Sequence, residues 1–312
     1  MSPFEQKIYH SILDLIGNTP LIQLHKIVPH GSARILAKLE SFNPGGSVKD
    51  RICLKMIEMA ESEGALTSGG VIIEPSSGNT GIGIAMVAAV KGYRCIVVIP
   101  ESMSLERQFI IKSYGAEVVL TASKKGMSGA IQRAKDLLAK TPDSFMPSQF
   151  MNQSNLEAHR QTTAKELMDA TNGKIDAFVV GVGTGGTLSG AGEVLKKANP
   201  DIQIVAVEPE GSAVISGKKS GTHKIQGIGA GFIPEILNRD LIDRIVTVKD
   251  AEAFETAGLL ARQEGLFMGI SSGAAVWASL KIAEELGAGK TLVTVLPDTG
   301  ERYFSTQQYF EV

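Results

Sequence analysis

"DAFVVGVGTGGTLSGAGEVLKKANP" (residues 176–200) joins a short apolar run, a glycine-rich turn and a helical pattern, in that order. The apolar run does not alternate with polar residues, which is typical of a strand buried on both faces of a parallel sheet. A second apolar run, at 202–210, follows the helical pattern. A strand, a helix and another strand in this order predict a parallel β-α-β unit.

The same order of elements appears earlier in the chain. The sequence predicts strands at 69–75, 94–101 and 116–121, a turn at 76–81, helices at 82–92 and 104–115, and a last strand within 290–300. We expect Ser104 to cap the second of these helices and Gly115 to end it. With two such runs divided near residue 150, we predict an α/β fold of two lobes. Each lobe is a mostly parallel twisted sheet flanked by helices, with a cleft between the lobes.

The composition is that of an ordinary globular protein and does not indicate a nucleic-acid or membrane protein. The 312 residues suit two domains or one large one, and 31 basic and 33 acidic residues give a net charge of −2 without a basic stripe. The N-terminal stretch 1–20 does not resemble a signal peptide, and the longest apolar run, 82–90, is too short to span a bilayer. We therefore predict a cytoplasmic protein that binds neither nucleic acid nor membrane.

Cysteine and histidine are sparse. The two cysteines, Cys53 and Cys95, provide neither a disulfide framework nor a zinc motif, which favours a reducing compartment. The five histidines are scattered, so no metal site is predicted.

The glycine-rich stretch 181–192 predicts a phosphate site. Backbone amides of such a turn, with a helix N-terminus behind them, bind phosphate oxygens. Gly181, Gly183 and Gly186 also match the dinucleotide pattern GxGxxG, and Glu208 ends the next strand, where such a site holds its ribose. The pattern alone does not choose between a dinucleotide and a smaller phosphate.

A second turn, "PSSGNTG" (75–81), also opens a helix. Its hydroxyls and free N–H groups fit either a carboxylate-sized anion or the cap of its own helix. Asn79 lies inside the turn and is hard to explain as a cap, so its amide is a candidate ligand group.

Lys49, in "NPGGSVKDR" (43–51), stands where a turn becomes a helix. A solvated surface lysine is the simplest interpretation. A cation at a helix N-terminus opposes the helix dipole, however, and that field lowers the lysine pKa. Such a lysine is suited to a Schiff base, and Gly45 and Gly46 leave space for a flat ligand. An aldehyde-binding lysine with a monophosphate cradle indicates pyridoxal 5′-phosphate (PLP), because a dinucleotide leaves Lys49 unexplained.

Five motifs stand in the order and spacing of fold-type II PLP enzymes: "NPGGSVKDR", "PSSGNTG", "GTGGT", "GIGAGF" and "GISSGAA". From "IGNTPLIQL" (16–24) to "LPDTGERYFST" (296–306), the chain resembles the cysteine synthase (O-acetylserine sulfhydrylase) family. The resemblance implies a tryptophan synthase β-like fold with PLP between two lobes. Residues 43–153 would form a smaller, mobile lobe with the substrate-carboxylate loop. Residues 1–42 and 154–312 would form the larger lobe with the phosphate loop.

The resemblance also assigns roles to single residues. Lys49 would hold PLP as an internal aldimine and act as general base, Asn79 would bind the 3′ oxygen, and Ser271 would face the ring nitrogen. Ser272 is the alternative to Ser271. The phosphate loop would be Gly183, Thr184, Gly185, Gly186 and Thr187, and the substrate-binding residues Ser76, Ser77, Gly78, Thr80, Gln149 and Gly227.

The implied reaction converts O-acetyl-L-serine and sulfide to L-cysteine and acetate through an α-aminoacrylate. A serine facing the ring nitrogen makes PLP a weaker electron sink, which fits β-replacement. The resemblance also implies a homodimer and a complex with the C-terminal tail of serine acetyltransferase. The alternatives are cystathionine synthesis, another β-replacement or β-elimination on serine derivatives, and a PLP-bound scaffold that regulates a partner. A dinucleotide dehydrogenase is the most distant alternative.

Overall fold

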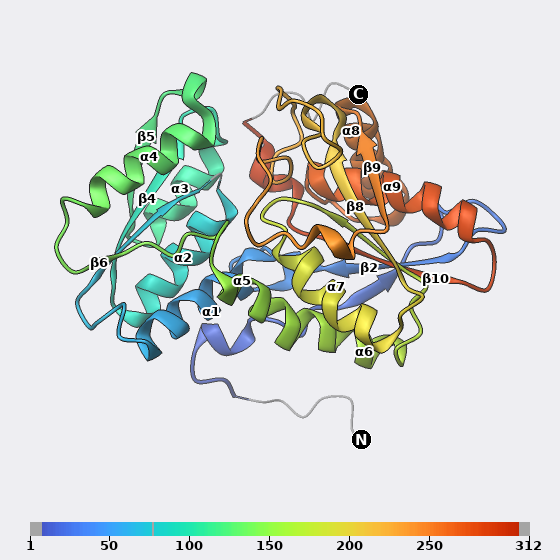
Figure 1. Ribbon diagram of the computed structural model, residues 1–312, viewed down its shortest axis with the longest axis horizontal. Helices are drawn as coiled ribbons and strands as arrows, with labels where there is room; N and C mark the ends of the chain where they lie inside the picture. Colours follow the sequence, from blue (N-terminus) through green and yellow to red (C-terminus); the bar gives the residue numbers. More distant parts are fainter. Residues whose placement is uncertain (1–7, 77, 306–312) are drawn as a thin grey trace.

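The computed structural model describes residues 8–76 and 78–305, and its strands form two separate sheets. Figure 1 shows the four-stranded sheet (left) beside the six-stranded sheet (right), with α1 and α5 between them in this view. Within the described residues, every strand pair is parallel except β1–β2. The predicted fold class, mostly parallel sheets flanked by helices, is confirmed.

The four-stranded sheet has the order β5-β4-β3-β6. Its strands are β3 (Val71–Pro75), β4 (Arg94–Pro100), β5 (Glu117–Thr121) and β6 (Ser144–Phe145). Alternate side chains of β3 and β4 face opposite sides, so that Ile72 and Val97 join one apolar cluster and Ile73 and Val98 another. The helices around this sheet are α1 (Lys49–Ser62), α2 (Asn79–Lys91), α3 (Leu105–Ser113) and α4 (Gly126–Leu138).

The six-stranded sheet has the order β1-β2-β10-β7-β8-β9. Its strands are β1 (Leu21–Gln23), β2 (Arg34–Leu39), β7 (Ala177–Gly181), β8 (Gln203–Pro209), β9 (Arg244–Val248) and β10 (Thr291–Leu296). Strand β10, the last in sequence among the described residues, therefore lies between β2 and β7 in the interior of the sheet. The buried, uninterrupted apolar runs of β7, β8 and β10 fit this position.

Helices cover both faces of the six-stranded sheet. Side chains of α6 and α7 share one apolar cluster with Phe178 and Val293, and those of α8 and α9 share another with Val179 and Leu292. The helices of this part are α5 (Gln153–Ala158), the π-helix η4 (His159–Thr163), α6 (Ala164–Thr171), α7 (Gly186–Ala198), α8 (Asp250–Leu259), the π-helix η7 (Leu260–Glu264) and α9 (Ile270–Leu286). Short 3₁₀ turns are η1 (Ile12–Leu15), η2 (Glu40–Phe42), η3 (Ser123–Lys125), η5 (Glu210–Ser212), η6 (Arg239–Leu241) and η8 (Gly300–Tyr303).

Two local predictions differ from the structure. Helix α2 begins at Asn79, three residues before the predicted start, so Asn79 lies in the first helical turn rather than in the preceding loop. Ser104 occupies the predicted N-cap of α3, but its hydroxyl makes no capping hydrogen bond and is buried without a partner among the described residues. Gly115 does follow the end of α3, with φ of 84°.

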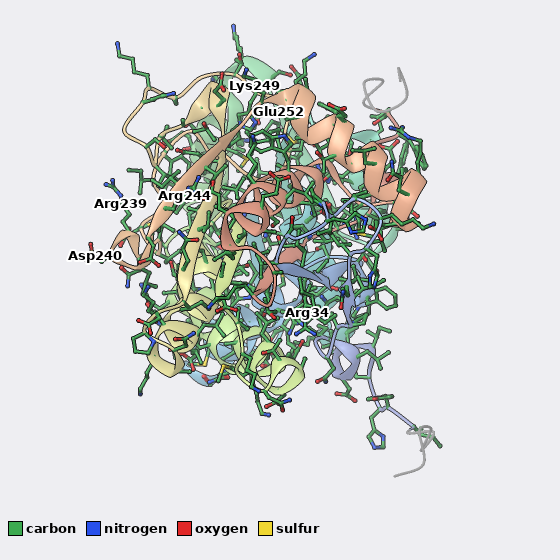
Figure 2. The ribbon with its side chains drawn as sticks, turned by 90° about the vertical axis from the view of Figure 1, so that its right-hand side faces the viewer. Arg34, Arg239, Asp240, Arg244, Lys249 and Glu252 are labelled. Atoms are coloured by element: carbon green, nitrogen blue, oxygen red, sulfur yellow. The ribbon has the colours of Figure 1, made fainter. Side chains whose placement is uncertain are left out.

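The surface beside β9 carries charges of both signs. Figure 2 shows Arg239 next to Asp240, and Lys249 near Glu252. Arg244 pairs with Glu285, and Glu252 accepts a hydrogen bond of 2.8 Å from the Lys249 amide. Among the described residues, no helix is both long and apolar enough to cross a bilayer, and no cluster of side chains could hold a metal ion. Cys53 and Cys95 are free and buried.

Candidate active site

Four helices begin at one pocket between the two sheets. Its lining includes the first residues of α1, α2 and α7, which are Lys49, Asn79 and Gly186, and the second residue of α9, Ser271. Unpaired backbone N–H groups and the helix dipoles give each of these helix ends a partial positive charge. The pocket is therefore suited to a ligand with more than one anionic group.

Lys49 is partly buried at the start of α1. Its amide bonds Ser47 Oγ at 3.2 Å, and the preceding Val48 amide bonds Pro297 O at 2.9 Å. Burial lowers the pKa of the Lys49 amine, while the nearby Cys53, Asp298 and Glu40 raise it by a smaller amount. The pKa is thus lowered, as expected, and desolvation is the largest cause.

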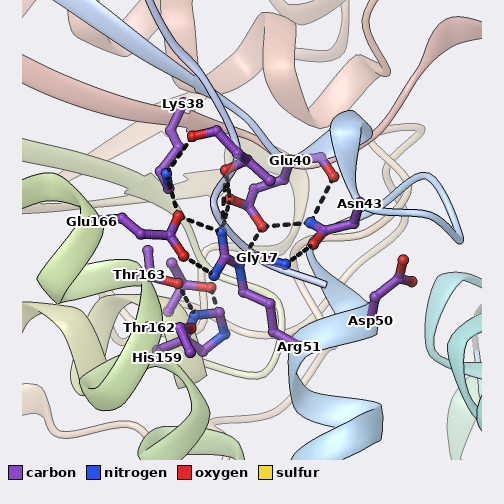
Figure 3. A network of polar contacts seen from close by, with 12 residues as sticks. Gly17, Lys38, Glu40, Asn43, Asp50, Arg51, His159, Thr162, Thr163 and Glu166 are labelled. Atoms are coloured by element: carbon purple, nitrogen blue, oxygen red, sulfur yellow. Dashed lines mark hydrogen bonds and ion pairs between the residues drawn. The ribbon is translucent and has the colours of Figure 1, made fainter. Parts of the chain in front are cut away.

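The start of α1 is held by a buried network of charges (Figure 3). Arg51 Nε bonds Glu40 at 2.7 Å, Arg51 Nη1 bonds Glu166 at 2.7 Å, and Lys38 Nζ bonds Glu166 at 2.6 Å. Although burial alone would raise the pKa of Glu166, bonds from Arg51 and Lys38 lower it to about 2. The network joins α1, β2 and α6, and so fixes the backbone two residues from Lys49.

The glycine positions of the loop after β7 leave no space for side chains. A Cβ atom at Gly183 would collide with the carbonyl oxygen of Gly227, and one at Gly186 would collide with Asn155 Oδ1. Gly185 has φ of 84°, a conformation that favours glycine, and directly precedes α7. The loop thus presents bare backbone at the helix N-terminus, as a phosphate cradle requires.

The two threonines of this loop are held by residues that sequence reasoning missed. Asn155 Nδ2 bonds Thr184 Oγ1 at 3.2 Å, and His159 Nε2 lies 3.2 Å from Thr187 Oγ1. Burial lowers the pKa of His159 to about 3, so its imidazole is neutral. Neither residue belongs to a recognisable motif, and only the fold places α5 and η4 against the loop.

The turn before α2 is organised by Ser76. Its buried Oγ accepts hydrogen bonds from the amides of Gly78 at 3.0 Å and Gly81 at 2.8 Å, so this hydroxyl serves its own turn. Gly78 has φ of 137°, and a Cβ atom there would collide with the side chain of Arg107. Ser77 lies outside the described residues.

Gln149 is attached to this turn from the side. Thr80 Oγ1 donates to Gln149 Oε1 at 2.6 Å, and Gln149 Nε2 donates to Pro75 O at 3.3 Å. Glu74 accepts the amides of Ser148 and Gln149 at 2.9 Å and 3.2 Å. Gln149 lines a neighbouring pocket that shares Lys49, Gly183, Thr184 and Gly227 with the first.

Ser271 lines the pocket and faces Gly227, with 3.7 Å from its Oγ to the Cβ position that Gly227 lacks. Ser272 Oγ is buried and has no partner among the described residues. Of the two serines, Ser271 is the one that lines the pocket.

Three residues around Asn79 have no counterpart among the predicted site residues. Asp298 and Arg302 bond its amide, and the buried Arg107 lines the pocket beside it. Asp298 and Arg302 belong to "LPDTGERYFST", which supports the resemblance but gives no role to either side chain.

The pocket fits PLP. A bare glycine loop at a helix N-terminus suits a single phosphate, and a partly desolvated lysine amine lies in the same pocket. Asn155 Oδ1 and Arg107 Nε, which border this region, are buried without partners among the described residues. These groups suit a polar ligand with a phosphate and an aldehyde.

Comparisons with known proteins agree with this site. The family model "Pyridoxal-phosphate dependent enzyme" matches residues 12–298. Cysteine synthase of Staphylococcus aureus is 53% identical over 97% of this chain and 98% of its own.

Two crystal structures are also similar. Cysteine synthase of Entamoeba histolytica has a TM-score of 0.94 and 45% identity, over 100% of this chain and 94% of that chain. The O-acetylserine dependent cystathionine β-synthase of Helicobacter pylori has a TM-score of 0.92 and 41% identity, over 96% of this chain and 98% of that chain. Because the family model matches nearly the whole length of the chain, the chain belongs to the pyridoxal-phosphate dependent enzymes.

Proposed function

We propose that the protein is a cysteine synthase, which converts O-acetyl-L-serine and sulfide to L-cysteine and acetate by β-replacement. The observation that carries this proposal is the shared pocket of Lys49, the glycine loop and the turn before α2. It combines an amine of lowered pKa with two separate anion sites. The likeness to cysteine synthases of two organisms supports the choice of substrate.

Different residues of the pocket would bind the cofactor and the substrate. Gly183 to Thr187 and the N-terminus of α7 would hold the phosphate, and Lys49 would hold the cofactor through its amine. Asn79 and Ser271 would fix the ring from two sides. PLP supplies an electron sink for the charge that develops when the substrate loses its α-proton.

Lys49 is the catalytic acid and base. A lowered pKa increases the neutral fraction of its amine, so that Nζ, once the substrate amine has replaced it on the cofactor, can accept the α-proton of the substrate and later return a proton. The hydrogen bond from the Lys49 amide to Ser47 Oγ and the Arg51 network fix the backbone from which this amine extends.

The turn before α2 would bind the substrate carboxylate. Here Asn79 and Thr80, the first two residues of α2, line the pocket, and Ser76 shapes the turn from behind. Thr80 is already bonded to Gln149. A carboxylate that binds at Thr80 would therefore disturb the hydrogen bond of Thr80 to Gln149. Gln149 would then close over the substrate and exclude water.

A second candidate is cystathionine synthesis, in which an alkyl thiol replaces sulfide. The pocket that adjoins Lys49 is lined partly by apolar side chains, including Met103, Met127 and Phe150, and these suit a thiol larger than sulfide. The Helicobacter pylori relative supports this candidate.

Visible absorbance of the purified protein tests the function. We expect a cofactor band that shifts to longer wavelength with O-acetylserine and returns when sulfide is added, with cysteine as product. A return with homocysteine but not with sulfide would favour the second candidate. A colourless protein would overturn the proposal.

We also propose that residues 43–153 form a lobe that moves relative to 1–42 and 154–312. The four-stranded sheet and its helices α1 to α4 lie within 43–153. Amide hydrogen exchange tests this proposal, because O-acetylserine should slow exchange in the turn before α2 and around Gln149.

The assembly and setting of the protein are further proposals. The resemblance supports a homodimer and binding of the serine acetyltransferase tail in the cleft, and two free, buried cysteines fit the cytoplasm. Sedimentation velocity with and without a peptide of that tail tests the homodimer and the binding of the tail. A dimer whose sedimentation does not change with the peptide would contradict the proposed partner.

A further inference from the structure

Asp298 is a buried carboxylate in the loop after β10, with 1% of its surface exposed. Its Oδ2 accepts hydrogen bonds from Asn79 Nδ2 and from the Tyr303 hydroxyl, both at 2.6 Å. The other oxygen, Oδ1, is packed against Gly269 and has no hydrogen-bond partner among the described residues. Arg107 Nη2 makes a longer contact with Oδ2, at 3.5 Å, so one oxygen takes every partner of this carboxylate. A buried carboxylate whose second oxygen has no partner is costly, which calls for a functional explanation.

Arg302 contacts the opposite end of the same amide. Its Nη1 donates to Asn79 Oδ1 at 2.9 Å, and its Nη2 bonds the carbonyl oxygen of Gly45, beside the loop that leads to Lys49. The Asn79 amide is thus held between a cation at its oxygen and an anion at its nitrogen. Rotating the amide by half a turn would place N–H groups against the guanidinium and oxygen against the carboxylate.

This arrangement leaves one amide hydrogen unused. A side-chain amide has two N–H donors, and Asp298 accepts one of them. Asn79 lines the pocket together with Lys49. We propose that Asp298 and Arg302 are positioning residues, which orient the Asn79 amide so that its second N–H faces the cofactor. The inference rests on the proposed function, since it names what sets the geometry of that site.

Besides orienting Asn79, Asp298 can act on Lys49 directly, because its charge raises the pKa of the Lys49 amine. The two effects predict different behaviour of combined substitutions. If Asp298 acts through Asn79, then Asp298→Ala has nothing further to remove once Asn79 is alanine. If it acts on Lys49, the two losses multiply.

The experiment is a double-mutant cycle of Asn79→Ala and Asp298→Ala in the holoenzyme. The readouts are the position of the cofactor band without substrate, the dissociation constant for PLP, and the rate of the spectral change with O-acetylserine. We expect each single variant to keep the cofactor, to shift the band in the same direction, and to lose roughly 10- to 100-fold in rate, as for a hydrogen bond to a charged group. The double variant should match Asn79→Ala within about twofold.

Losses that multiply in the double variant, or an unshifted band in Asp298→Ala, would overturn the inference. Tyr303→Phe is the matched control, since it removes the Tyr303 hydrogen bond to Asp298 Oδ2 and leaves the contacts of that oxygen with Asn79 and Arg107, and its band should match that of the wild type. If Asp298→Ala does not fold, Asp298→Asn keeps the shape without the charge and enters the same cycle. A colourless wild type would overturn the proposed function, whereas a normal wild type with multiplying losses would overturn this inference alone.

Discussion

The guanidinium of Arg107 lies over the ring of Tyr303, with 4.4 Å from its central carbon to the ring centroid, and its Nη2 donates to the Tyr303 hydroxyl at 2.7 Å. Arg107 comes from α3, beside the four-stranded sheet, whereas Tyr303 lies in η8, near the end of the described chain. A second nitrogen of the guanidinium bonds Gln226 at 2.5 Å. One buried cation therefore connects α3 with two segments that belong to the other side of the pocket.

Arg107→Met should destabilise the protein strongly. The substitution keeps part of the stem but leaves the buried carboxylate of Asp298 and the part-buried amide of Gln226 without their cation. We expect a cost of about 3 kcal/mol in the free energy of unfolding. Denaturant unfolding measures this loss. Arg94→Met is the control, because Arg94 forms an exposed pair with Glu117 at 2.8 Å, so this variant should lose much less stability than Arg107→Met. Equal losses in the two variants would contradict the structural role of Arg107.

Lys49→Ala should remove the visible cofactor band and lower turnover by at least about 10³-fold, since the variant lacks the acid-base group. Absorbance and a cysteine assay measure the two effects. Lys55→Ala, on the same helix but outside both pockets that contain Lys49, should keep the band and the rate. Turnover by Lys49→Ala at the wild-type rate would exclude Lys49 as the base.

Gly183→Ala should weaken PLP binding about tenfold or more, because the new methyl group collides with the Gly227 carbonyl and displaces the loop. Titration of the cofactor-free protein with PLP measures the affinity. Gly192→Ala, within α7, is the control, since its nearest neighbours are 3.8 Å from the added atom. Alanine in a helix interior stabilises by about 0.5–1 kcal/mol, so this variant should bind PLP normally and unfold later. Similar affinities of both variants would contradict a tight cradle.

His159 should make stability depend on pH. Burial lowers its pKa from 6.5 to about 3, so between these values the unfolded chain binds a proton that the folded protein does not. The stabilising contribution is complete above pH 6.5 and is lost as the pH falls towards 3, by up to about 1.4 kcal/mol per pH unit.

His159→Gln should therefore flatten the dependence of unfolding free energy on pH between 6.5 and 4, which denaturant titrations at several pH values will reveal. His30→Gln replaces an exposed histidine and should leave the wild-type slope. The same slope in the wild type and in both variants would rule out His159 as the source.

The repeated strand, glycine turn and helix were predictable because each is a local pattern. Five strands fall within or next to their predicted ranges: β3, β4, β5, β7 and β8. They could be predicted because strands buried in a parallel sheet have continuous apolar sequences. Strands β1, β2 and β9 were not predicted, and nothing in the local sequence indicates that β10 pairs with β2.

The site residues also differ in whether a local sequence pattern reveals them. Lys49, Asn79 and the glycine loop occur in motifs whose residue types are unusual for their positions. Arg107 instead lies in an amphipathic helical pattern where a charged residue is expected to face water, and it is 1% exposed. The contact of Asn79 with Asp298 spans 219 residues of sequence. Such pairings depend on how the sheets pack, which periodicity does not encode.

The interior position of β10 has a consequence for synthesis on the ribosome. Strand β2 has no parallel partner until β10 has been synthesised. Residues 71–145, which provide every strand of the four-stranded sheet, are synthesised between these two strands. That sheet can form during translation, whereas the six-stranded sheet is left with an open gap and exposed strand edges until the last fragment leaves the exit tunnel. The loop after β10 carries Asp298, so the pocket is completed at that same late moment. A truncated chain that stops before residue 291 is expected to expose those edges and to aggregate.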